Sequence, residues 1–221
     1  MSKTTTMRGA SATPAPARER ADRDRRGRIS ATPPILHYGF RPFFFLASLH
    51  AGLAVPVWLW LFLAGPPTVG PFTGLQWHVH EMLFGYLAAV IAGFILTAVP
   101  NWTGRLPLSG RPLAGLVALW LAGRAAGALV SEPVLAMAAD LAFPMALAFA
   151  VWREEVAGRN WRNAPVAGLI TLFGVANALH HGANLDLVDA PTGPRLALGA
   201  AALLMALIGG RIVPSFTRNW L

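Results

Sequence analysis

Histidines are the residues of this sequence best suited to chemistry, because they recur in close pairs at the ends of apolar segments. His78 and His80 stand two residues apart at the start of one such segment, and His180 and His181 are adjacent at the end of another. Imidazole nitrogens bind copper, zinc and haem iron. The chain has no cysteine, which excludes thiolate and iron–sulfur sites. A metal or haem site would therefore use histidine, methionine and carboxylate ligands.

The elements that must position these histidines are long apolar helices. Hydrophobic residues make up 55% of the 221-residue chain and charged residues only 13%, against roughly a quarter charged in soluble domains. Six segments reach the length of about 20 apolar residues that a helix needs to cross a bilayer. The sequence thus predicts an all-α, polytopic membrane bundle over residues 35–221. The predicted spans are residues 42–63, 78–99, 113–129, 134–152, 164–180 and 196–213.

The basic residues predict how this bundle is oriented. Residues 1–34 are rich in Ala, Thr, Pro and Arg, which is typical of a disordered basic tail. If the tail is cytoplasmic, all the Lys and Arg residues except Arg124 and Arg195 fall on that side, as the positive-inside rule requires. We expect a multi-pass protein of a bacterial inner membrane with both termini in the cytoplasm. The basic side chains then set the membrane topology and contact lipid headgroups. This interpretation removes nucleic acid as a partner.

Helix direction predicts that the two histidine pairs lie at one depth. The second and fifth spans run in opposite directions, so His78 and His80 meet the same outer leaflet as His180 and His181. On the fifth span, Asn177, His180 and His181 fall on one helix face, at i, i+3 and i+4. We therefore predict a polar cluster that opens to the outside and holds copper or haem. The alternative is a set of interfacial histidines satisfied by water, headgroups or backbone carbonyls.

Helix faces predict which side chains enter this cluster. At about 100° per residue, one small-residue face of the second span should turn into the bundle, and it consists of His78, Glu81, Met82, Gly85, Ala89 and Ala92. His80 falls on a bulkier face, which either contacts lipid or forms an apolar wall for a macrocycle. His50, in the first span, lies on an alanine-rich face and should also point inward.

A buried ion pair is predicted between the third and fourth spans. Arg124 and Asp140 lie at matching depths on either side of a short turn, which makes their helices antiparallel neighbours. An isolated charge at membrane depth costs several kcal/mol. Gly123 and Gly127 have the spacing that lets two helices approach closely. We interpret the pair as structural, with a proton relay as the alternative.

Several strings in the sequence resemble the NnrS family. They are GFRPFF (39–44), WHVHEMLFGY (77–86), AGFILTAVPNWTGR (92–105), PLSGRPLAGL (107–116) and GGRIVPSFTRNWL (209–221). The resemblance implies a polytopic protein of the bacterial cytoplasmic membrane that carries haem and copper and is linked to denitrification and nitric-oxide stress. It does not assign the ligands. His78, His80 and Glu81 lie in its most specific string.

The chain also departs from that family in length. Members usually have roughly twelve spans, so this chain resembles an N-terminal half, and a second six-helix polypeptide or a homodimer is an expected partner beside the bilayer. The leading functional hypothesis is a haem- and copper-containing protein of nitric-oxide metabolism or resistance. The alternatives are a transporter or channel subunit, for which Arg124, Asp140 and Glu81 would form the polar path, and a non-catalytic assembly or sensor subunit. Nothing in the sequence shows turnover of a substrate.

Overall fold

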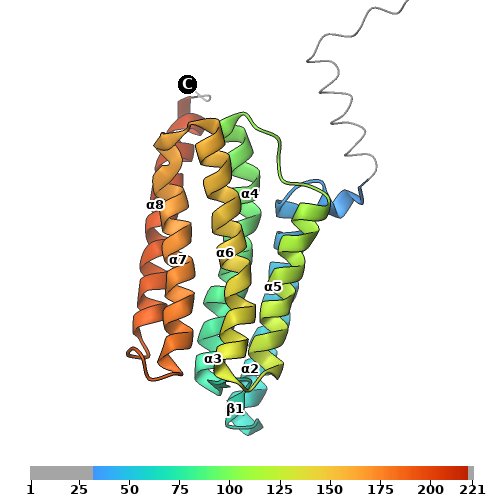
Figure 1. Cartoon of the computed structure of the whole chain (residues 1–221), viewed down its shortest axis with the longest axis vertical. Helices are drawn as coiled ribbons and strands as arrows, with labels where there is room; N and C mark the ends of the chain where they lie inside the picture. The colour runs from blue at the N-terminus through green and yellow to red at the C-terminus, as the bar shows by residue number, and fades with distance from the viewer. Residues whose placement is uncertain (1–31, 219–221) are drawn as a thin grey trace, which may run out of the picture.

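Six long helices stand side by side in the structure of this chain, a computed structural model that describes residues 32–218 (Figure 1). The predicted disordered tail, residues 1–34, lies almost wholly outside the described residues. The helices and strands follow in chain order. They are η1 (Pro34–Leu36), α2 (Phe40–Ala64), β1 (Thr68–Val69), β2 (Phe72–Thr73), α3 (Gly74–His80), η2 (Glu81–Leu87), α4 (Ala88–Thr103), α5 (Arg111–Leu129), α6 (Pro133–Gly158), η3 (Trp161–Asn163), α7 (Ala164–Ala183) and α8 (Thr192–Arg218).

Six helical spans are long and apolar enough to cross a membrane, as predicted. Each helix is longer than the predicted apolar stretch, and α5 differs the least, because it begins two residues earlier and ends at the predicted Leu129. The second span is the longest: α3, η2 and α4 form one helix of 30 residues, Gly74–Thr103. Large apolar side chains such as Phe62 and Leu63 point outward. That outer surface is typical of a protein whose solvent is lipid, so the chain is a multi-pass membrane protein.

Helix α6 occupies the middle of the bundle. It packs against α4, α5 and α7, while α2 packs against α4 and α8 against α7. Residues of α3, η2, α6 and α7 meet near the end of the bundle that carries the β1–β2 hairpin, which is the end opposite the C-terminus in Figure 1. The second and fifth spans are therefore close at the level where the histidine pairs lie.

The second span is interrupted by a π-helical segment, η2, directly after His80. π-Helical turns are rare and are frequent at functional sites. The wider turn contains Gly85, whose backbone carbonyl accepts a hydrogen bond of 3.1 Å from Trp120 Nε1 of α5. A Cβ at Gly85 would lie only 2.7 Å from both Arg124 Nη1 and His50 Nε2. A larger residue at this position would therefore displace polar groups that three spans bring together.

The β1–β2 hairpin covers this end of the bundle. Gly70 forms its turn with a φ of +55°, and a Cβ there would clash with the carbonyl oxygen of Gly127. The Thr73 side chain and Gln76 form a capping box at the start of α3. The hairpin is thus fixed both to α5 and to α3, and between these anchors it places Phe72, which is completely buried.

Close packing of α5 against α6 yields a first prediction. A Cβ at Gly123 would lie 2.5 Å from Asp140 Oδ1 and 3.2 Å from Asp140 Cα, whereas one at Gly115 on the same helix would meet nothing within 4 Å. Gly123→Ala should destabilise the fold by about 1–3 kcal/mol through overpacking. Gly115→Ala, the matched control, should be neutral or stabilising by up to about 1 kcal/mol. Thermal unfolding in detergent measures both, and equal stabilities would contradict the packing described here.

Candidate metal centre

Asp140 is the hub of a buried polar cluster formed by four helices. Its Oδ2 atom lies 3.0 Å from His80 Nε2 and 3.1 Å from His181 Nε2, and it accepts a 2.7 Å hydrogen bond from Asn177 Nδ2. Its Oδ1 atom accepts a hydrogen bond from Arg124 Nη2. Asp140 is 1% exposed. A carboxylate removed from solvent in this way is satisfied entirely by protein donors.

Arg124 connects Asp140 to a second buried carboxylate, Glu81. Arg124 Nη1 donates to Glu81 Oε2 over 3.0 Å, and His50 Nε2 lies 3.0 Å from that same oxygen. The other carboxylate oxygen, Glu81 Oε1, lies 3.0 Å from His80 Nδ1. His80 therefore has one carboxylate at each ring nitrogen. The pair predicted between Arg124 and Asp140 is present, and it belongs to a larger network.

Aromatic rings close the cluster above and below. Phe72 of the hairpin stacks on His80 with ring centroids 4.6 Å apart, and its centroid lies 5.4 Å from that of His180 and 5.2 Å from that of His181. On the opposite side Phe84 lies 5.6 Å from His80 and 5.7 Å from His180. These rings exclude water, so the charges between them interact in a low-dielectric setting.

His180 differs from the other histidines of the cluster. It is buried, it stacks on His80 with centroids 5.5 Å apart, and neither ring nitrogen has a hydrogen-bond partner among the described residues. The face predicted to hold Asn177, His180 and His181 is split. Asn177 and His181 reach Asp140, while His180 lies between the Phe72 and Phe84 rings.

The predicted inward face of the second span is confirmed for Glu81 and for the small residues Gly85, Ala89 and Ala92, which are buried, and it is wrong for His78 and Met82. His78 stacks on Trp58 of α2 with centroids 4.0 Å apart, and Met82 packs in an apolar group with Trp58 and Val69. His80, for which contact with lipid was considered, is instead completely buried beside Glu81. Consecutive side chains of a helix, about 100° apart, still reach one cluster when each has a partner on a different neighbouring helix.

Phe72 was not found from the sequence, and Asp140 was expected to pair with Arg124 but not with the histidines. Gly85 was placed on the inward face of its helix, without its contacts to Arg124 and His50. The Gly70-Pro71 turn followed by Thr73 and Gln76 is a recognisable hairpin and capping signal that predicts a fixed loop at this position. The π-helical turn at Gly85 leaves no comparable pattern in the sequence.

His80, Asp140 and His181 have the arrangement of a metal-ligand set. Their nearest ligand atoms all lie within 4.8 Å of one another. Four ligands at metal bonds of about 2.0 Å in a tetrahedron are separated by about 3.3 Å, close to the 3.0 and 3.1 Å between Asp140 Oδ2 and the two imidazole nitrogens. Glu81 at His80 Nδ1 completes the carboxylate–histidine arrangement that orients metal-bound imidazoles.

Charge balance also favours a cation at this position. Glu81 and Asp140 contribute two negative charges, and Arg124 contributes one positive charge. Buried charge without compensation is strongly unfavourable in a membrane interior. A further positive charge must therefore come from an imidazolium or from a metal ion. In the metal-free protein, a His80 that carries both ring protons can donate to both carboxylates.

These observations define a class of protein: a six-span membrane protein that encloses a buried centre of histidine, carboxylate and arginine side chains near one end of its helical bundle. The chain belongs to the NnrS family, because the model of the NnrS protein family matches residues 34–221. No curated protein and no solved structure matches the chain. The residues of the centre lie within the matched region.

The arginine link yields a second prediction. Arg124→Met leaves two buried carboxylates without their shared cation, so it should lower stability by about 3–5 kcal/mol. Adding Asp140→Asn restores the original net charge and should recover part of the loss, since the two residues are in contact.

A surface pair provides the control for this cycle. Arg105 contacts Glu154 in an exposed ion pair, so Arg105→Met should change stability by less than about 1 kcal/mol. Denaturation of the purified variants in detergent measures all of these effects. A double variant no more stable than Arg124→Met would show that the buried groups are not coupled.

Proposed function

We propose that this chain is a copper-binding membrane protein of nitric-oxide metabolism or resistance, and that His80, Asp140 and His181 hold the metal. The convergence of two imidazole nitrogens on one buried carboxylate oxygen carries the proposal. The donor set itself suits copper, zinc or iron(II). Family membership favours copper and the link to nitric oxide. A bound copper ion would supply one-electron redox chemistry and a coordination position for a neutral diatomic ligand.

The residues around the proposed ligands have separate roles. Glu81 holds the proton on His80 Nδ1, which leaves Nε2 free to face a metal. Arg124 fixes both carboxylates and balances part of their charge, and Asn177 orients Asp140 through its 2.7 Å hydrogen bond. Phe72 and Phe84 keep water out. Because binding a cation replaces the proton between His80 and Asp140, metal affinity should fall as the pH is lowered.

The buried histidines do not fit a haem, the second cofactor that the family implies. The His80 ring is packed among other rings, with centroid distances of 4.6 Å to Phe72, 5.5 Å to His180 and 5.6 Å to Phe84. The ring centroid of His181 lies 5.1 Å from that of His80. A macrocycle would have to displace these rings and separate α3 from α7. We therefore assign no haem to this centre.

A transport role is less well supported than a metal site. A transporter or channel needs a polar path that continues from the buried charges across the bilayer. Directly below the centre, the described residues form an apolar layer of Phe84, Ala88, Phe143 and Phe173. This layer separates the centre from the remainder of the bundle. It favours a closed ligand-binding site over a conducting pathway.

Copper binding provides the third prediction. His80→Ala and His181→Ala should each lower copper content after reconstitution at least tenfold, because each removes one of three ligands. His78→Ala is the matched control: its ring stacks on Trp58, outside the centre, so copper content should be unchanged. Elemental analysis and the Cu(II) electron paramagnetic resonance spectrum measure the outcome.

The same variants also test whether nitric oxide binds at the proposed copper site. An infrared band of metal-bound nitric oxide should appear in the copper-loaded protein and be absent from His181→Ala. Copper retained in both His80→Ala and His181→Ala would overturn the assigned ligands. Uptake of iron or zinc in place of copper would preserve the site and overturn the identity of the metal.

We also propose that the centre faces the outside of a bacterial inner membrane, which is the fourth prediction. Arg105, Arg111 and Arg153 stand at the end of the bundle opposite the hairpin, and the positive-inside rule places that end in the cytoplasm. Reporter fusions after Gly70, Ser131 and Asp186 should read as external. Fusions after Gly104, Gly158 and Leu221 should read as internal, and one loop with the reverse reading would overturn this orientation.

A further inference from the structure

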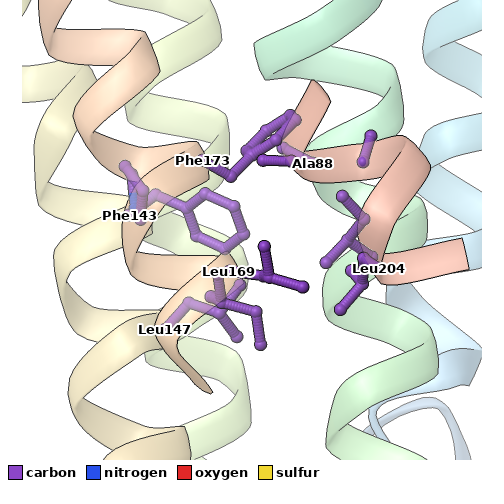
Figure 2. Close-up of a pocket in the computed structure, with 11 residues that line it drawn as sticks. Ala88, Phe143, Leu147, Leu169, Phe173 and Leu204 are labelled. Atoms are coloured by element: carbon purple, nitrogen blue, oxygen red, sulfur yellow. The ribbon is translucent and has the colours of Figure 1, made fainter. Parts of the chain in front are cut away.

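An apolar cavity lies between four helices beneath the polar centre. Side chains of α4, α6, α7 and α8 surround it (Figure 2). Figure 2 shows Phe143 and Phe173 on one side of the space, with Leu147 and Leu169 below them and Leu204 opposite. The lining consists of apolar residues throughout. They are Ala88, Ile91, Phe143, Pro144, Leu147, Leu169, Ile170, Phe173, Ala200, Ala201 and Leu204.

The size and lining of the cavity limit what can occupy it. It leaves about 20 Å³ of room for the centre of a water-sized molecule, and about 10–15 Å³ is enough for one such molecule. A water molecule needs two to four polar partners, which these side chains do not supply. An uncharged apolar molecule of two or three atoms meets no such cost. The cavity therefore suits a small dissolved gas.

Two aromatic rings connect the cavity to the centre. Phe173, which lines the cavity, lies 5.5 Å from Phe84 by ring centroids. Phe84 is in turn 5.6 Å from His80 and 5.7 Å from His180. The rings of Phe173 and Phe84 thus lie between the gas-sized space and the histidines. Rotation or displacement of these two rings would join the cavity to the centre.

Helix α6 links the same two places through its backbone. Pro144 lines the cavity and lacks the N–H group that would bond to the carbonyl of Asp140, four residues earlier. Pro144 also lies against Gly174 of α7, where an added Cβ would be 3.3 Å from the proline Cβ. The turn of α6 between the carboxylate and the cavity therefore has one hydrogen bond fewer than a regular helix.

We propose that this cavity is a binding site for a small uncharged apolar gas of the nitric-oxide class, which reaches the metal centre from the membrane interior past Phe84. The proposal rests on the proposed function for the identity of the gas. The binding site itself rests on the shape and lining of the cavity. Such a gas partitions into the hydrocarbon core, so a reservoir at membrane depth receives its ligand directly from the bilayer.

Xenon is the probe that tests the cavity, because it is apolar, of similar size and independent of any metal. The full chain, purified without metal in detergent, is examined by ¹²⁹Xe exchange NMR, and a saturable bound signal is expected. Ala201→Leu should fill the cavity and lower xenon affinity about tenfold or more. Ala202→Leu adds the same volume on the adjacent, exposed position of α8, and should leave xenon binding unchanged.

A second variant with an enlarged cavity is needed, because Ala201→Leu could lose xenon binding simply by misfolding. Leu204→Ala removes buried volume from the lining and should leave a larger dry space, so xenon affinity should rise. Loss of binding in Ala201→Leu, with a gain in Leu204→Ala, supports the site. Absence of saturable xenon binding in the native chain, or equal effects of Ala201→Leu and Ala202→Leu, overturns it.

A kinetic measurement tests the route past Phe84. In the copper(I)-loaded protein, association of carbon monoxide should be slower in Ala201→Leu than in Ala202→Leu. Equal rates would overturn the route from the cavity to the metal. Xenon binding without copper uptake would instead overturn the proposed function and retain the gas site, so the two failures are distinguishable.

Discussion

The guanidinium group of Arg124 is the constraint on which the rest of this structure depends. It carries a positive charge into the bundle and contacts a carboxylate on each of two other helices, Glu81 of η2 and Asp140 of α6. The planar fork of an arginine fixes both distance and direction. Helix α5 must therefore approach both neighbours closely, which explains why Gly85 and Gly123 are needed at the points where a Cβ would strike the network.

The second constraint is solvent exclusion around these charges. Phe72 lies over the histidines from the hairpin, and Phe84 lies beneath them from the same span that supplies His80. Inside this shell each charge interacts strongly with the next, since little water screens it. Positions that look separable along the chain are therefore coupled in the fold. His80 shows this most clearly, because its two ring nitrogens face different carboxylates.

Much of the architecture could be predicted from the sequence, because membrane length and the pairing of buried charges are strong constraints. The six spans and the neighbours Arg124 and Asp140 follow from hydropathy, depth and one short turn. The places of the two histidines of the second span did not: His78 was placed inside, where the structure has His80. Which of them enters the cluster depends on the partners that the neighbouring helices offer, Trp58 beside His78 and Asp140 beside His80, and spacing along one helix does not reveal those partners. The identity of a metal likewise could not be predicted, because it depends on the electronic preference of the metal ion for its ligands as well as on the spacing of those ligands in the sequence.

The separation of the charged groups along the chain has a consequence for biogenesis. Asp140 follows Arg124 by 16 residues, so the α5–α6 hairpin enters the bilayer with its own counter-charge. Glu81 is synthesised 43 residues before Arg124, and its span must begin insertion before that cation exists. His50, from the preceding span, is already made and lies 3.0 Å from Glu81 in the finished fold. The carboxylate thus has one of its folded-state neighbours within the first two spans, before the third has been synthesised.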